Sequence, residues 1–436
     1  MKKNNIVKVL SIISVLALSI SISACNGDNE SKEETDESVA SLSEESTENE
    51  DAEPSGLVSE MKKEKKNPEE DTGPIPEIED PTPDNYGETV NGVFIYNDVG
   101  YELFYGDEEM AEEYAHTISD IKTALGDKIK VYNLVVPTHV GVDLPDKFND
   151  LCSSQDTYLN KIVNSYTADV IGVNAYNKIV HHRNEYLYFN SDHHWTALGA
   201  YYAYRAFANT AGIDPIDLKD LNEDKIEGYT GSLVSFSGVE TLKEDYVSYY
   251  TTNQDIDCTL YDEYGQNPQD YLLIHSYVEG SNSYGVFLGG DQPLLVTKNS
   301  EGNGKKIAVI KESYGNALAP FFAYTYSEAH FIDFRYADIN LKSYLEQNGI
   351  DEVIFFNNAM ASATPANLDS LRSLVSNNSN YTEAEESYDD EDNADDNEEY
   401  DNENYDYDEN DYYNDNDDDY YDDYYDGNDE NYDEYE

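Results

Sequence analysis

Two short polar segments of the chain carry the residue types that nucleophilic catalysis requires. Ser313 follows a strand-like run and precedes a helix-like one, a place where its hydroxyl would be exposed and main-chain N–H groups would face a developing oxyanion. A serine at its free pKa is a poor nucleophile, so it needs a base, and His194 could serve. Asp192 could orient that imidazole, because residues i and i+2 of an extended segment fall on the same side while His193 points away. The neighbouring Trp195 could shield the pair from water.

Each of these residues also has a structural interpretation. Ser313 and Asp192 could be N-caps of the helices that follow them. Asp192 could instead bind a metal ion together with His193 and His194, although adjacent histidines diverge and no third well-spaced ligand follows. Because 119 positions separate His194 from Ser313, spacing alone leaves these alternatives open.

The elements that would position these segments lie within residues 91–380 and alternate between helices and strands. Strands that are separated by helices indicate a mostly parallel sheet covered on both faces, with ligands at the carboxyl ends of its strands. Two apolar runs at 93–96 and 102–105 predict a hairpin, and short strands with turns predict a β-rich insertion over a larger scaffold at about 228–297. We expect helices at 107–126, 154–167, 174–183, 196–211, 314–326, 341–348 and 366–375, and strands at 129–136, 186–189, 246–252, 258–261, 272–277, 285–288, 306–310, 330–334 and 353–356.

Two acidic arms flank this block and account for much of the formal net charge of −66. Residues 381–436 hold 29 of the 92 acidic residues and 13 tyrosines, with no Lys or Arg. Residues 25–90 are rich in Ser, Glu, Asp and Pro. Both compositions predict disorder. Residues 381–436 would form a solvating tail or a weak multivalent binder, and residues 25–90 a tether. The charge argues against a nucleic-acid partner, since phosphate contacts need cationic side chains.

The first 24 residues predict a signal peptide, because lysines flank an apolar run that is too short to span a membrane comfortably. The run ends in Ser23-Ala24-Cys25, which resembles a bacterial lipoprotein signal. The resemblance implies cleavage before Cys25, lipidation of its thiol and attachment to the extracytoplasmic face of the cell membrane; an ordinary secretory leader is the alternative. Cys152 and Cys258 could pair or remain free, and their spacing does not decide.

The run Asp192-His193-His194-Trp195 is the signature of the DHHW protein family of Gram-positive bacteria, which the chain resembles over most of 91–375. Further segments that resemble this family are 91–96, 231–233, 289–294 and 310–316. The family is similar in turn to the SGNH-hydrolase-like domains of alginate O-acetylation proteins. The resemblance implies a three-layer α/β/α fold and an Asp–His–Ser triad, with Asp192 as the orienting acid, His194 as the base and Ser313 as the nucleophile. Glu312 departs from the related segments, which usually have Asp before the serine.

Together these features predict a surface-anchored, serine-dependent carbohydrate O-acetyltransferase or acetyl esterase that acts on a cell-envelope polysaccharide and needs no cofactor. The polysaccharide or another acyl acceptor would be its partner, and a membrane-bound protein could supply the acyl group. The alternatives are a non-catalytic lipoprotein that binds glycan or protein, and a metal-binding lipoprotein that uses Asp192 and the paired histidines.

The Tyr314 N–H and a Gly289 or Gly290 amide are the expected oxyanion donors. Arg335 would position a substrate oxygen or form a structural salt bridge, and further expected supporting residues are His193, Trp195 and Asn316.

Overall fold

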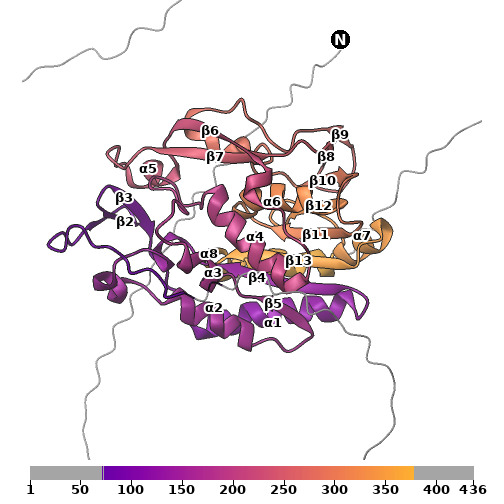
Figure 1. Cartoon of the computed structure of the whole chain (residues 1–436). Coiled ribbons are helices and arrows are strands. Elements are labelled where there is room, and N and C mark those ends of the chain that lie inside the picture. The colour runs from indigo at the N-terminus through magenta and orange to yellow at the C-terminus, as the bar shows by residue number, and fades with distance from the viewer. Residues whose placement is uncertain (1–70, 72, 378–436) are drawn as a thin grey trace, which may run out of the picture. The chain divides into compact units, whose positions relative to one another are not determined.

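The computed structural model describes residue 71 and residues 73–377, and its centre is a mixed eight-stranded sheet (Figure 1). Cys25, the predicted signal peptide, residues 25–70 and 72 of the predicted tether and the acidic tail lie outside the described residues. The last part of the predicted tether, 73–90, is described and ends in a strand at Glu88–Val90 that pairs with the strand after it, so the prediction of disorder is wrong there. Five neighbouring strands run parallel, and three antiparallel strands extend the sheet at one edge. In spatial order the strands are β5 (Val170–Val173), β4 (Lys130–Val136), β13 (Glu352–Asn358), β11 (Lys306–Lys311), β12 (Glu328–Asp333), β10 (Leu294–Asn299), β8 (Ile256–Tyr261) and β9 (Gln269–Asp270).

The central strands form because their sequences are nearly continuous apolar runs, which suit a sheet that is buried on both faces. Every residue of β13 is buried, and β4 is buried after its first residue. Their side chains alternate between two cores: Tyr132 and Leu134 contribute to one, and Val131 and Val135 to the other. The sheet therefore separates two layers of helices.

Helices cover both faces of the sheet and complete a three-layer α/β/α fold, as predicted. One core contains side chains of α3 (Tyr176–His181), α4 (Ala197–Ala211) and α6 (Tyr314–Thr325). The other contains side chains of α1 (Glu108–Leu125), α2 (Gln155–Asn164), α7 (Leu341–Asn348), α8 (Ala359–Ser362) and α9 (Pro365–Ser376).

Capping residues fix the helix that follows the candidate catalytic segment. The Thr196 side chain accepts a hydrogen bond from the Gly199 N–H and begins α4, and Gly212 ends α4 in the left-handed conformation, with φ of 66°. A hydroxyl at the N-cap and a glycine after the last turn are the expected helix signals. Asp192 is therefore not the N-cap of this helix.

The N-terminal strands β1 (Glu88–Val90), β2 (Val93–Tyr96) and β3 (Val99–Glu102) form a separate antiparallel sheet. The predicted hairpin is present, but its second strand begins at Val99 and not at residue 102. The reason is a two-residue turn at Asn97 and Asp98, whose φ values of 51° and 65° suit the tight hairpin turn that asparagine and aspartate favour.

The predicted β-rich insertion divides between two sheets. Strands β6 (Asn222–Tyr229) and β7 (Asp245–Thr251) pair with each other, and the short helix α5 (Ser232–Ser237) connects them. Strands β8 to β10 do not lie over the scaffold; they extend the main sheet, because β10 pairs with β12. The strands expected at 272–277 and 285–288 reduce to one bridge between Ile274 and Phe287, and the strand expected at 186–189 reduces to a bridge between Tyr188 and Trp195.

Both cysteines of the described residues are free thiols. Cys152 is half-buried and Cys258 is buried, and burial raises the pKa of the Cys258 thiol to about 12. No helix in the part of the chain that the structure describes is long and apolar enough to cross a membrane.

Candidate active site

The structure brings Ser313 and His194 into contact at the carboxyl end of β11. Ser313 occupies the turn between β11 and α6, and its Oγ lies 2.8 Å from Nε2 of His194. Its backbone is already helical, with φ of −61° and ψ of −28°, and its side chain makes no N-cap hydrogen bond. The serine hydroxyl is therefore directed to an imidazole and does not cap the helix.

Asp192 holds the opposite side of the same imidazole. Its Oδ1 lies 2.6 Å from His194 Nδ1 and also accepts the His194 backbone N–H at 2.9 Å, while its Oδ2 accepts the Ser232 backbone N–H at 2.8 Å. Burial opposes ionisation of this carboxyl, but the two histidines and the Ser232 N–H outweigh burial and hold the pKa of Asp192 well below its usual value. An ionised Asp192 keeps the proton of His194 on Nδ1 and leaves Nε2 free to accept the serine proton.

Aromatic rings pack on both sides of the imidazole. The ring of Tyr284 stacks on His194 with centroids 3.9 Å apart and an interplanar angle of 13°, and the ring of His193 lies 3.8 Å away on centroids. Trp195 is fully buried, and its Nε1–H donates to the Tyr314 carbonyl at 2.9 Å. The Tyr314 hydroxyl in turn donates to the His193 carbonyl. These contacts connect the histidine segment to the first turn of α6 and fix the distance between base and nucleophile.

Glu312 is a buried side chain next to Ser313. Its Oε2 accepts the Tyr314 N–H at 2.9 Å and faces Ser313 Oγ at 3.3 Å, and its Oε1 accepts the backbone and side-chain N–H groups of Asn358 at 3.0 and 3.2 Å. Burial raises the pKa of Glu312. Glu312 thereby takes the capping role at α6 that sequence reasoning gave to Ser313, and it connects the ends of β11 and β13.

The expected oxyanion donors are only partly free. The Tyr314 N–H donates to Glu312, and the Gly290 N–H donates to the Phe287 carbonyl at 3.1 Å. Both amides therefore have hydrogen-bond partners in this structure. The Gly289 N–H has no partner among the described residues, and Gly289 has φ of 66°, a conformation that favours glycine.

Arg335 is tied to two carboxylates beside the site. It donates to both oxygens of Asp333, at 2.8 and 2.7 Å, and pairs with Asp291 at 2.9 Å. Burial opposes these charges, but Arg335 and the buried Lys311 hold the pKa of Asp291 below its usual value. Asn316 donates to Asp291 at 2.9 Å, and its buried Oδ1 has no partner among the described residues. Arg335 therefore forms structural ion pairs, and 27% of its side chain stays exposed.

The donor atoms of Asp192, His193 and His194 lie within 4.8 Å of one another, as a metal site would require. Both nitrogens of His194 are engaged, however, with Asp192 and with Ser313, and His193 Nδ1 is bonded to the Ser232 hydroxyl. A metal ion would have to replace these hydrogen bonds, so the arrangement suits proton transfer better than metal ligation.

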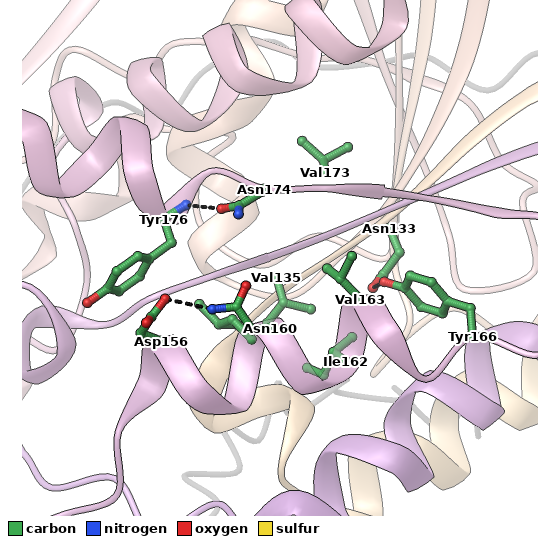
Figure 2. A pocket seen from close by; sticks show the side chains of 11 residues that line it. Asn133, Val135, Asp156, Asn160, Ile162, Val163, Tyr166, Val173, Asn174 and Tyr176 are labelled. Atoms are coloured by element: carbon green, nitrogen blue, oxygen red, sulfur yellow. Dashed lines mark hydrogen bonds between the residues drawn. The ribbon is translucent and has the colours of Figure 1, made fainter. Parts of the chain in front are cut away.

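The hollow in Figure 2 lies between β4, α2, β5 and α3 and includes none of the triad residues. Its volume is about 10 Å³, comparable to one water molecule. Its polar side chains satisfy one another, as in the bond from Asn160 to Asp156 at 2.9 Å. We assign it no function.

Sequence reasoning missed three groups that hold the site together. The Asp245 carboxylate accepts the backbone N–H groups of Asn190 and Ser191 at 2.9 and 2.8 Å and anchors the histidine segment. Ser232 and Tyr284 belong to the insertion, and nothing in the sequence places them beside the histidines. The segment 231–233 did carry a signal, because it is one of the segments that resemble the family. In the structure Gly231 lies so close to Asp192 that a Cβ there would be 2.1 Å from the Cβ of Asp192.

Comparisons with known proteins identify the family and the fold. The profile of the DHHW protein family matches residues 26–332. The crystal structure of a DHHW family protein from Eubacterium siraeum is 29% identical, with a TM-score of 0.62; the match covers 66% of this chain and 97% of that chain. No curated protein matches the sequence.

The fold is also similar to that of PatB1 from Bacillus cereus, which is 18% identical to this chain. Two of its structures match with TM-scores of 0.52 and 0.51, and each match covers 63% of this chain and 98% or 96% of that chain. The second of these structures contains a sulfonyl adduct.

Proposed function

The chain belongs to the DHHW protein family, and from this premise we propose that it is a serine-dependent carbohydrate O-acetyltransferase or acetyl esterase acting on a cell-envelope polysaccharide. The observation that carries the proposal is the continuous chain of contacts from Ser313 Oγ to His194 Nε2 and from His194 Nδ1 to Asp192, at 2.8 and 2.6 Å. Lipidation at Cys25 would hold the protein at the extracytoplasmic face of the membrane. There it would meet its acceptor and a membrane-bound acyl donor.

In the first half of the reaction, Ser313 Oγ attacks the carbonyl carbon of an acetyl ester while His194 Nε2 accepts the hydroxyl proton. Asp192 stabilises the imidazolium that forms, and the Gly289 N–H is the free amide available for the oxyanion. Collapse of the tetrahedral intermediate releases the alcohol of the donor, which takes the proton from His194, and leaves an acetyl-serine.

In the second half, a sugar hydroxyl or water gives its proton to His194 and attacks the acetyl-serine. Collapse of the second tetrahedral intermediate breaks the bond between the acetyl group and Ser313 Oγ, which takes the proton back from His194. Phe236 is 53% exposed and stacks near His193, with centroids 6.2 Å apart, so it offers an aromatic face to a sugar ring beside the histidine segment. Attack by the sugar makes the protein a transferase, and attack by water makes it an esterase.

Covalent labelling tests the nucleophile directly. The full-length protein is treated with a sulfonyl fluoride, the adduct is measured by intact mass, and its position is determined by peptide mapping. We expect one adduct on Ser313 that is lost in Ser313→Ala and in His194→Ala. Ser154→Ala and His116→Ala are matched controls, because the first removes an exposed serine that caps a helix and the second an exposed histidine. Labelling that persists in Ser313→Ala would refute the proposal.

Two further measurements separate the alternatives. Hydrolysis of a chromogenic acetate ester with and without an added oligosaccharide distinguishes esterase from transferase, since only a transferase moves acetyl to the sugar. Metal content of the purified protein, measured together with labelling, tests the metal-binding alternative. A protein that retains stoichiometric metal and takes no label would belong to that alternative class.

A further inference from the structure

His193, the first histidine of the paired histidines, keeps one ring nitrogen free. Its Nδ1 is hydrogen-bonded to the Ser232 hydroxyl, whereas its Nε2 has no partner among the described residues. Nε2 is also absent from the buried side-chain atoms that lack a partner, so a molecule outside the chain can reach it. Proton transfer along the triad requires Asp192, His194 and Ser313 but not His193. The free nitrogen is therefore available to a substrate.

The contacts of the two histidines direct both Nε2 atoms to the same side. The imidazole rings lie 3.8 Å apart on centroids, and His194 Nδ1 bonds to Asp192. His193 Nδ1 bonds to Ser232, whose N–H donates to Asp192 at 2.8 Å, so the two partners lie side by side. In each ring Nε2 points away from the partner of Nδ1. Since His194 Nε2 reaches Ser313 Oγ at 2.8 Å, His193 Nε2 is directed to the side on which the nucleophile lies.

The short helix α5 adds an exposed aromatic ring next to His193. Ser232 and Phe236 are four residues apart in α5, so their side chains lie on one face of the helix. The Phe236 ring is nearly parallel to the His193 ring, with centroids 6.2 Å apart and an angle of 22°. Because 53% of Phe236 is exposed, its ring has a face open to a ligand. An apolar ring face next to a hydrogen-bonding nitrogen suits a sugar ring, which has both apolar C–H groups and hydroxyls.

The charges around His193 favour a neutral sugar over an acidic one. The carboxyl groups of Asp192, Glu102 and Glu312 lie close enough to act on this imidazole. Burial lowers the pKa of His193, so the ring is neutral near pH 7 and offers no positive charge. Arg335, a cation beside the site, is already paired with carboxylates. A sugar carboxylate would therefore be repelled, whereas a hydroxyl can donate to or accept from a neutral imidazole.

We propose that His193 and Phe236 form the sugar-binding subsite of the proposed reaction and select a neutral sugar ring. Phe236 stacks on the sugar ring, and His193 Nε2 hydrogen-bonds a hydroxyl next to the one that carries or receives the acetyl group. The same contacts hold the sugar whether it attacks the acetyl-serine or leaves as the alcohol of an acetyl ester, because the two steps are the reverse of each other. This subsite rests on the proposed function, since it requires an acetyl-serine at Ser313.

Partition of the acetyl group between sugar and water tests the subsite. Full-length protein is given 4-nitrophenyl acetate and increasing concentrations of methyl β-D-glucopyranoside. Release of 4-nitrophenol reports formation of the acetyl-serine, and the ratio of acetylated glucoside to acetate reports its transfer. We expect this ratio to rise saturably with glucoside. Methyl β-D-glucuronide is the matched ligand, because it has the same ring with a carboxylate. It should need an about fivefold higher concentration for half-maximal partition, the effect of one like-charge contact in water.

Two variants remove the proposed contacts one at a time. His193→Phe keeps a ring beside Phe236 but removes Nε2, and it should raise the half-saturating glucoside concentration about three- to tenfold. Phe236→Leu should raise it about threefold or more. His193→Gln places a polar group near the Nε2 position and should recover part of the loss. Tyr86→Leu removes a ring that is 76% exposed beside Lys147 and is the matched control. Release of 4-nitrophenol should stay at the wild-type rate in all four variants, since it depends on the triad alone.

The results separate this subsite from the function on which it rests. If the wild type takes no sulfonyl label on Ser313, or releases no more 4-nitrophenol than Ser313→Ala, the proposed function is refuted and the subsite with it. If labelling and release are normal, three results overturn the subsite alone: no transfer to glucoside, transfer to glucuronide at equal or lower concentration, or wild-type glucoside dependence in both His193→Phe and Phe236→Leu. Release slowed in His193→Phe as much as transfer would show that His193 acts on the triad, which also overturns the sugar-binding role.

Discussion

Replacing Asp192 by Asn tests whether its charge organises the candidate triad. The carboxylate accepts two hydrogen bonds from His194 and one from the Ser232 N–H, at 2.9, 2.6 and 2.8 Å, and the Tyr229 hydroxyl is a further partner. An asparagine offers one oxygen and an NH₂ group. If the oxygen faces His194, the NH₂ opposes the Ser232 N–H and one buried hydrogen bond is lost. If the NH₂ group faces His194 instead, both hydrogen bonds from His194 are lost, or the imidazole takes the tautomer that cannot accept the serine proton.

The magnitudes follow from this count. Loss of one hydrogen bond to a charged group costs about 1.5–3 kcal/mol of unfolding free energy. Labelling of Ser313 by a sulfonyl fluoride should slow much more, by roughly 10³–10⁴-fold, because the charge that stabilises the imidazolium is gone and the wrong tautomer is favoured. Asp120→Asn, at an exposed position of α1, is the control and should change neither quantity.

The pH dependence of the unfolding free energy gives a second test of the Asp192 charge. The pKa of Asp192 is lowered in the folded state, so its ionised form stabilises the protein above the unfolded pKa of about 3.9, and this stabilisation is lost as the pH falls through the lower folded pKa. Urea unfolding should therefore show a gap between wild type and Asp192→Asn at pH 7 that narrows below about pH 4. An equal gap at pH 7 and pH 3, or a wild-type labelling rate in the variant, would refute the assigned role.

Three further predictions concern stability and reactivity. Trp195→Phe should lower the unfolding free energy by about 1–3 kcal/mol in urea titrations, because it removes the indole hydrogen bond to the Tyr314 carbonyl and part of a fully buried ring; an unchanged midpoint would contradict this. Lys311→Met should cost about 1.5–3 kcal/mol, since it removes one of the two cations that pair with the buried Asp333 carboxylate, which keeps Arg335, whereas Lys306→Met, at a more exposed pair, should cost no more than about 1 kcal/mol; equal losses would show that burial does not matter here. Cys258 should resist iodoacetamide at pH 8 until urea unfolds the protein, because burial raises its pKa to about 12; peptide mapping that finds it alkylated in the folded protein would contradict its burial.

The layered fold was predictable because local chemistry determines most of it. Strands β4 and β13 are apolar runs with period-two alternation between two cores, and α4 has a hydroxyl cap and a terminal glycine. The insertion was harder to predict, because strand pairing is non-local. The pairing of β10 with β12 adds β8 to the main sheet, and no pattern within either sequence specifies the partner.

The candidate catalytic residues were predictable as residue types, but their contact was not. Asp192 and His194 are two positions apart, so their meeting follows from backbone geometry. The meeting of His194 with Ser313 across 119 residues depends on the packing of α4 against α6 and on the bond from Trp195 to the Tyr314 carbonyl. The distance between His194 and Ser313 results from tertiary packing, whereas sequence patterns show only which residues could form such a contact.

Glu312 explains why one of the predicted oxyanion donors, the Tyr314 N–H, already has a partner in this structure. A serine before a helix is normally its cap, and the amide after it is then free to face a ligand. Here the longer Glu312 side chain reaches past Ser313, accepts the Tyr314 N–H at 2.9 Å and binds Asn358 on β13 with its other oxygen. The serine is thereby released from capping and turns to His194, but the amide is occupied. An oxyanion donor must then come from the Gly289 region or from movement of Glu312, so the residue that frees the nucleophile also restricts where the ester carbonyl can bind.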